Sequence, residues 1–106
     1  MKKIIPAAIA ATLAASSLFG FQKGDAEKGK ELFEQCSVCH NADSTEKKMG
    51  PGLKGLYKKA KLGNGKAVND ANVKAVIDAG GNGMPAYESI LSNEEKAHVM
   101  AYLKTL

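Results

Sequence analysis

The chain has 106 residues, a length that suits one domain rather than two. Hydrophobic residues make up 44% and charged residues 25%, ordinary values for a globular protein that argue against disorder and against several membrane spans. The formal net charge is +4, but all basic residues are lysines, without an arginine cluster or interleaved aromatic residues, so the sequence gives no support for nucleic-acid binding.

The N-terminal segment has the pattern of an export signal. Lys2 and Lys3 precede an uncharged apolar run over residues 4–21, which matches the basic and hydrophobic regions of a secretory signal. The run also reaches the lower length limit for crossing a bilayer, so an uncleaved anchor is the alternative. We expect residues 1–21 to be a signal peptide or N-terminal anchor and residues 22–106 to form the domain. The expected location is the periplasm, with the protein either soluble or tethered to the inner membrane.

The domain begins with a predicted helix that has Asp25 as its N-cap and runs to about Cys36. Gly29, Leu32 and Phe33 fall on one face of this helix together with Cys36. A glycine inside a helix costs about 1 kcal/mol relative to alanine. Gly29 therefore indicates a place where another helix crosses closely.

The two cysteines, Cys36 and Cys39, are followed directly by His40 in a C-x-x-C-H motif. A disulfide between them would close a very short loop and add little stability. A thioredoxin-like pair is accompanied by strands, for which the sequence has no pattern, and a zinc site needs more ligands than His98, the other histidine, can add. On a helical turn the three side chains share one face, where two thiols can form thioethers to a porphyrin while the imidazole reaches its iron. The motif therefore predicts one covalently attached haem c.

The ligand on the other side of the iron has several candidates. Met84 lies in a segment with three glycines and a proline, which predicts a loop. A loop can bring the thioether to the haem without placing a helix against it, so Met84 is the expected ligand. Met100 falls in a predicted helix, where packing is the common role of methionine. Met49 follows soon after the attachment motif and is a minor candidate at the rim. His98 is the chemical competitor, but its polar helical surroundings favour an exposed or partly packed side chain.

Two further helices complete the expected fold. A short helix is predicted over roughly residues 72–79, ending at a pair of glycines. The last helix begins with a capping box formed by Ser92 and Glu95, and its apolar stripe consists of Val99, Tyr102, Leu103 and Leu106. These patterns predict an all-α fold in which crossed N- and C-terminal helices and loops surround one covalent haem.

Over essentially all of the expected domain, this order of motifs resembles that of the class I c-type cytochromes, in particular the small bacterial monohaem type. The resemblance rests on Cys36–His40, Gly50-Pro51-Gly52-Leu53, Gly83-Met84-Pro85, and a final helix with Tyr102 and Leu103. It implies that Cys36 and Cys39 form the thioethers. It also implies that His40 and Met84 bind the iron, with the Pro51 carbonyl accepting the His40 Nδ1–H. Finally, it associates Tyr57 with a haem propionate.

The expected function is electron transfer between larger redox proteins, without an enzymatic reaction. With both axial positions filled, the iron offers no place for a substrate, and cycling between Fe(III) and Fe(II) remains. Lysines 47, 48, 54, 58, 59 and 61 are expected to steer transient docking onto an acidic surface, although a plain solvated face explains them equally well. The alternative is a haem enzyme or gas-binding protein with an open or displaceable distal ligand. A thiol oxidoreductase is the third hypothesis.

Overall fold

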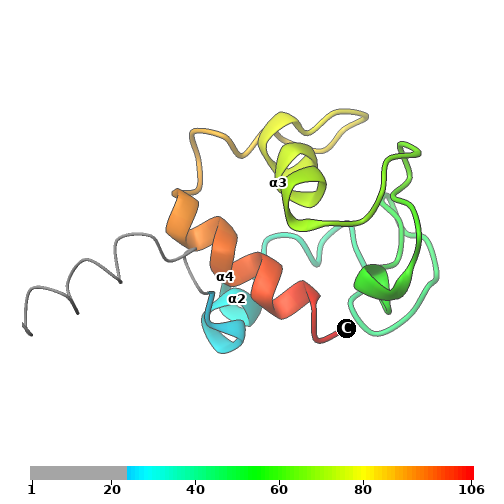
Figure 1. The fold of residues 1–106 in the computed structure, drawn as a ribbon, viewed down its shortest axis with the longest axis horizontal. Helices are drawn as coiled ribbons and strands as arrows, with labels where there is room; N and C mark the ends of the chain where they lie inside the picture. Colours follow the sequence, from blue (N-terminus) through cyan, green and yellow to red (C-terminus); the bar gives the residue numbers. More distant parts are fainter. Residues whose placement is uncertain (1–23) are drawn as a thin grey trace, which may run out of the picture.

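The computed structural model describes residues 24–106, so the expected signal or anchor lies outside the described residues. It contains the α-helices α2 (Ala26–Phe33), α3 (Asp70–Ala79) and α4 (Asn93–Leu103) and the short 3-10 helix η1 (Leu56–Lys58) (Figure 1). Across residues 24–106 no strand forms, and pairing is limited to isolated bridges in two turns. The prediction of an all-α fold is therefore confirmed. No helix in this part of the chain is long and apolar enough to cross a membrane.

Helices α2 and α4 cross closely, although they lie at opposite ends of the described chain (Figure 1). Gly29 lies at the crossing, because a Cβ atom there would overlap the backbone carbonyl of His98. Beside it, the rings of Phe33 and Tyr102 are 5.3 Å apart in a tilted arrangement. The backbone N–H of Asp25 donates to His98 Nδ1 at 2.8 Å. The close crossing predicted at Gly29 is confirmed.

Helix α2 begins as predicted but ends earlier. The Asp25 carboxylate accepts from the backbone N–H of Glu27 at 2.9 Å, which caps the helix. The helix ends at Phe33, whereas the prediction extended it to about Cys36. The Ser37 hydroxyl donates to the Glu34 carbonyl at 2.6 Å, and such side-chain bonds compete with regular helical bonding. The chain therefore continues past Phe33 as a series of turns.

Helix α3 begins slightly before its predicted start. The side chain of Asn69 caps it by accepting from the backbone N–H of Asn72 at 2.8 Å. The helix ends at Ala79, and Gly80 follows with a φ of 61°, a conformation that glycine adopts without steric cost. The end of α3 therefore agrees with the predicted glycine stop.

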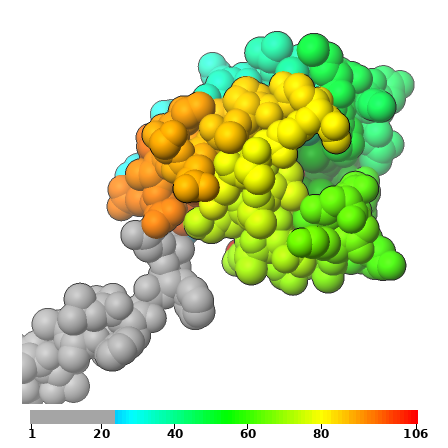
Figure 2. All heavy atoms as spheres, turned by 90° about the horizontal axis from the view of Figure 1, so that it is seen from above, coloured from blue at the N-terminus to red at the C-terminus, as the bar shows by residue number. Residues whose placement is uncertain are grey.

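Helix α4 begins with the predicted capping box. Ser92 Oγ accepts from the Glu95 N–H at 3.0 Å, and Glu95 Oε1 accepts from the Ser92 N–H at 2.9 Å. Its apolar face packs against α2 and α3, and the buried core consists of Phe33, Leu56, Val73, Ile77, Tyr87, Leu91, Val99 and Leu103. Around this core other apolar side chains remain half-buried, among them Cys36, Leu53 and Met84. In the space-filling view, a recess separates the yellow segment near residue 80 from the green segments that precede α3 (Figure 2).

Candidate functional site

Cys36, Cys39 and His40 lie on one turn directly after α2. The His40 N–H donates to the Cys36 carbonyl at 2.9 Å, and the Cys39 N–H donates to the same carbonyl at 3.1 Å. The first of these is the bond of an α-helical turn, which places residues i, i+3 and i+4 on one face. Both cysteines are free thiols and half-buried. The turn thus presents two sulfurs and an imidazole to the same side.

The environment of the thiols disfavours the other interpretations of the motif. Burial raises the pKa of the Cys36 thiol, and the neighbouring Cys39 raises it further. Disulfide exchange at a C-x-x-C pair is favoured by a lowered thiol pKa, and the direction at Cys36 is the opposite. Among residues 24–106 there is also no group of three or more His, Cys, Asp or Glu side chains placed to hold a metal ion.

The segment around Pro51 orients His40. His40 Nδ1 lies 2.8 Å from the Pro51 carbonyl oxygen, and donation along this contact leaves Nε2 as the nitrogen with a free lone pair. Gly50 packs on the ring, because a Cβ atom there would lie 2.5 Å from His40 Cε1. The Gly50 N–H donates to the Cys39 carbonyl at 2.8 Å, which ties this segment to the attachment turn. The imidazole is therefore held with its metal-binding nitrogen directed away from Pro51.

Met49 lies beside the attachment turn at the surface. Its side chain is 78% exposed, and its Sδ is 3.8 Å from Cys39 Sγ. The adjacent Lys48 donates to the Ser37 carbonyl at 2.9 Å. Together these contacts keep the segment before Gly50 close to the cysteines.

Met84 lies in an ordered turn after α3. Gly81 and Met84 exchange backbone hydrogen bonds of 2.9 and 3.0 Å. Between them, Asn82 and Gly83 have φ values of 53° and 91°, and positive φ at both central residues is characteristic of the tight type I′ turn. Gly80 packs under the turn, since a Cβ there would overlap the Met84 carbonyl oxygen. The Met84 side chain is half-buried against the core.

Tyr87, three residues after Met84, lies in the interior. It is buried, and burial raises the pKa of its hydroxyl, with a further rise from the Cys36 and Cys39 thiols. Tyr87 belongs to the buried core, and both Cys36 and Met84 pack against that core as half-buried side chains.

The other two sequence candidates belong to the packing of the helices. His98 Nδ1 accepts the hydrogen bond from Asp25 at the α2–α4 crossing. Met100 is half-buried against the core, which confirms the predicted packing role.

Tyr57 takes part in a polar contact within the protein. Its hydroxyl donates to Asp70 Oδ1 at 2.8 Å, and Lys104 Nζ lies 3.0 Å from the other oxygen of that carboxylate. Burial, followed by the bond to Asp70, raises the pKa of Tyr57. The hydroxyl proton is thus donated to a side chain of the same protein, and the association of Tyr57 with a propionate stays a prediction.

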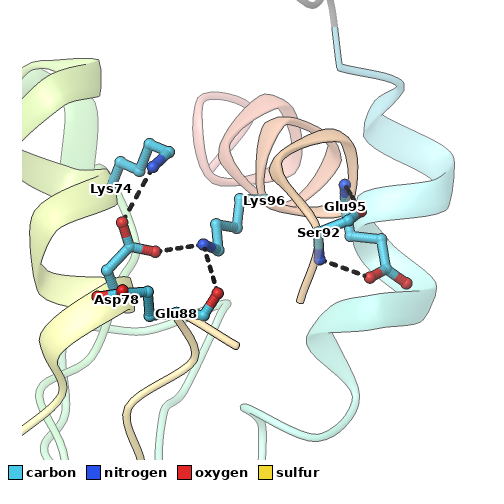
Figure 3. Close-up of polar contacts among 6 residues, drawn as sticks. All are labelled: Lys74, Asp78, Glu88, Ser92, Glu95 and Lys96. Carbon is cyan, nitrogen blue, oxygen red and sulfur yellow. Dashed lines mark hydrogen bonds and ion pairs between the residues drawn. The ribbon is translucent and has the colours of Figure 1, made fainter. Parts of the chain in front are cut away.

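Sequence patterns did not predict the role of Lys96, which is only 2% exposed. Its ammonium pairs with Asp78 Oδ1 and donates to the Glu88 carbonyl at 3.2 Å (Figure 3). The available signal was its position, since Lys96 lies at helical spacing with the buried Val99 and Leu103.

The known proteins to which this chain is similar share one description. Residues 26–106 match the family model described as Cytochrome c. The chain is 41% identical to a cytochrome c of Cochliobolus lunatus over 63 residues, which cover 56% of this chain and 57% of that protein. It is 48% identical to a cytochrome c of Stellaria longipes over 40 residues, or 36% of this chain and 37% of that protein. The chain thus aligns with less than two thirds of the length of either relative.

A solved structure is similar over a larger share of the molecule. Cytochrome c6 from the diatom Phaeodactylum tricornutum superposes with a TM-score of 0.61 at 26% sequence identity. The match covers 77% of this chain and 93% of that one. The likeness therefore extends over nearly the whole of the diatom protein.

Proposed function

Because the chain belongs to the cytochrome c family, we propose that it is a monohaem carrier that passes single electrons between larger redox proteins in the periplasm. Its cofactor is haem c, held covalently, which supplies one-electron Fe(III)/Fe(II) chemistry when bound. The observation that carries this proposal is the attachment turn, where two free thiols and an oriented imidazole share one side.

The residues of the site fit this cofactor. Free thiols at Cys36 and Cys39 are the groups that thioether formation requires. His40 donates through Nδ1 to a backbone carbonyl, the arrangement typical of metal-binding histidines. Half-buried apolar side chains such as Leu53 border the core and suit a large, flat apolar group.

We assign His40 and Met84 as the two axial ligands. His40 offers Nε2 because the Pro51 carbonyl accepts from Nδ1. Met84 offers a thioether from a tight turn that two backbone hydrogen bonds with Gly81 stabilise. With both positions filled by the protein, substrate has no access to the iron, which favours electron transfer over catalysis.

An exposed surface near the attachment turn is the proposed docking site for acidic redox partners. Val38 and Met49 are exposed apolar side chains on and beside this turn. The segment after this turn carries six exposed cations, Lys47, Lys48, Lys54, Lys58, Lys59 and Lys61. None of these lysines forms an ion pair within residues 24–106, and the Lys48 ammonium donates only to a neutral carbonyl, so their charges are not neutralised by a carboxylate of the described chain. Small interfaces of this kind suit brief encounters.

The optical spectrum of the matured protein tests the ligand assignment. We expect low-spin spectra, a Met-to-iron charge-transfer band in the oxidised state, and no change when carbon monoxide is added to the reduced state. Met84→Ala should remove the band and allow carbon monoxide to bind, whereas Met49→Ala, at an exposed methionine, should leave both properties unchanged. A native protein that binds carbon monoxide freely would instead support the haem enzyme or gas-binding alternative.

Cell fractionation and mass spectrometry test the location. The proposal requires haem protein in the periplasmic fraction or on the outer face of the inner membrane. A mature mass that lacks the first 21 or so residues would indicate a cleaved signal, and an intact N-terminus with membrane association would indicate an anchor. Haem protein confined to the cytoplasm would contradict both forms.

A further inference from the structure

Lys96 is a charged side chain inside the core. It lies in the second turn of α4 and is 2% exposed, although lysine is seldom fully buried unless it is paired. Its partners are Asp78, at the end of α3, and the carbonyl of Glu88 (Figure 3). A buried ammonium is tolerated only with such partners, so the position of Lys96 depends on both segments.

The two partner segments are the points where the Met84 loop leaves and rejoins the fold. The Tyr87 N–H donates to the Ile77 carbonyl at 2.9 Å, and the Glu88 N–H donates to the Asp78 carbonyl at 3.3 Å. Between these points the chain runs out through the turn that carries Met84 and back. Lys96 contacts both sides of this base and joins it to α4.

The turn above the base is closed by its own backbone contacts. Its tight backbone bonds between Gly81 and Met84, and the packing of Gly80 beneath it, leave little internal freedom. Because the turn is closed on itself and is joined directly to the base, a displacement of the base would displace the turn and the Met84 side chain with it. The contacts of Lys96 and Asp78 act on that base.

We propose that Lys96 and Asp78 are positioning residues for the distal ligand: their buried ion pair locks the base of the loop and so keeps Met84 on the iron. This inference rests on the proposed role of Met84 as ligand. Neither residue contacts the cofactor in this account, because both act through the backbone of the loop.

Asp78 has a second partner that provides a matched control. Lys74 Nζ lies 2.9 Å from Asp78 Oδ2, one turn earlier on the same helix, and its side chain is 37% exposed. This pair stays within α3 and does not reach α4 or the Glu88 segment. Lys74→Gln therefore removes one positive charge beside Asp78 while leaving the base of the loop joined to α4.

The experiment compares holoprotein variants Asp78→Asn, Lys96→Met and Lys74→Gln with the native protein. For the reduced proteins, the rate of carbon monoxide binding reports how often Met84 leaves the iron. We expect Asp78→Asn and Lys96→Met to bind carbon monoxide at least about tenfold faster than native. Asp78→Asn leaves the buried Lys96 ammonium without its carboxylate partner, and Lys96→Met removes the contacts that join the base of the loop to α4. Lys74→Gln should stay within about twofold of native, because an i,i+4 pair within one helix contributes little.

Global unfolding in urea, followed by far-ultraviolet circular dichroism, separates positioning from general stability. If Asp78→Asn and Lys96→Met unfold more easily but bind carbon monoxide at the native rate without urea, the proposal is overturned. If Lys96→Met does not fold, Asp78→Asn alone decides, because it preserves the shape of the side chain. If native protein binds carbon monoxide as fast as Met84→Ala, the ligand assignment itself has failed, an outcome distinct from failure of the ion pair.

Discussion

Gly29→Ala tests the helix crossing on which the domain depends. Helix propensity alone predicts a gain, because alanine is favoured over glycine by about 1 kcal/mol in a helix interior. The structure predicts the opposite sign, since the added Cβ would overlap the His98 carbonyl and lie 2.9 Å from Tyr102 Cβ. The overlapped atom belongs to the backbone of α4, so the clash cannot be relieved by rotating a side chain.

The expected change in the free energy of unfolding follows from how α2 and α4 must move apart to accept the added Cβ atom. Overpacking of a tight contact costs about 1–3 kcal/mol, and this site belongs at the upper end because the whole of α4 must shift. Separation also weakens the Phe33–Tyr102 ring pair, found at 5.3 Å, whose geometry contributes roughly 0.5–1.5 kcal/mol. After the gain in helix propensity is subtracted, we expect a net loss of about 2–3 kcal/mol in the free energy of unfolding.

Urea unfolding of the holoprotein, followed by circular dichroism, measures this difference. Gly63→Ala is the control, because a Cβ at Gly63 meets nothing within 4 Å and its φ is not positive. The control should stay within about 0.5 kcal/mol of native. A Gly29→Ala protein as stable as native, or more stable, would refute the close approach of α2 and α4 at this residue.

Three other substitutions probe separate contacts. Phe33→Ala should cost about 3–5 kcal/mol in urea unfolding, because the side chain is 4% exposed in the core, and a loss below about 1 kcal/mol would contradict that burial. Tyr57→Phe should make unfolding less sensitive to alkali: the pKa of Tyr57 is raised from 10.0, so the native protein loses stability as pH rises above that value, and the variant should lose less between about pH 10 and 12. Asn82→Val should destabilise the Met84 turn by roughly 1–2 kcal/mol, because a branched residue resists a φ of 53°, while Asn82→Gly should be close to neutral in thermal unfolding.

The parts of the fold that the sequence predicted well are those governed by local chemistry. The capping box at Ser92 and Glu95 is formed by two neighbouring side chains and the backbone between them, so its pattern is sufficient. The glycine stop after α3 and the Asp25 cap are local in the same sense. Gly29 was predictable for a different reason, since a glycine in a helix is unfavourable unless close packing requires it.

The parts that were missed depend on contacts between distant segments. The burial of Lys96 requires Asp78 on another helix, and no spacing rule within α4 names that partner. The bond from Tyr57 to Asp70, at the start of α3, likewise joins two segments that no local pattern connects. The earlier end of α2 follows from turn bonding around Ser37, which competes with helix by small energy differences.

In the candidate site, too, local spacing predicted some features, whereas others depend on segments far apart in the chain. The C-x-x-C-H spacing was sufficient to predict that Cys36 and His40 share a helical turn, because the sulfurs and the imidazole are only a few residues apart. The family resemblance implied that the Pro51 carbonyl accepts from His40, and in the structure the two atoms are 2.8 Å apart. The ligand roles of His40 and Met84 stay predictions until spectra are recorded.

The pairing of α2 with α4 has a consequence for the order in which the domain folds. With 8 residues, α2 is too short to persist alone in water, so this helix depends on its packing against α4. Cys36 and Cys39 follow α2 directly. The turn that carries the two sulfurs therefore becomes ordered only when two helices far apart in the chain have met.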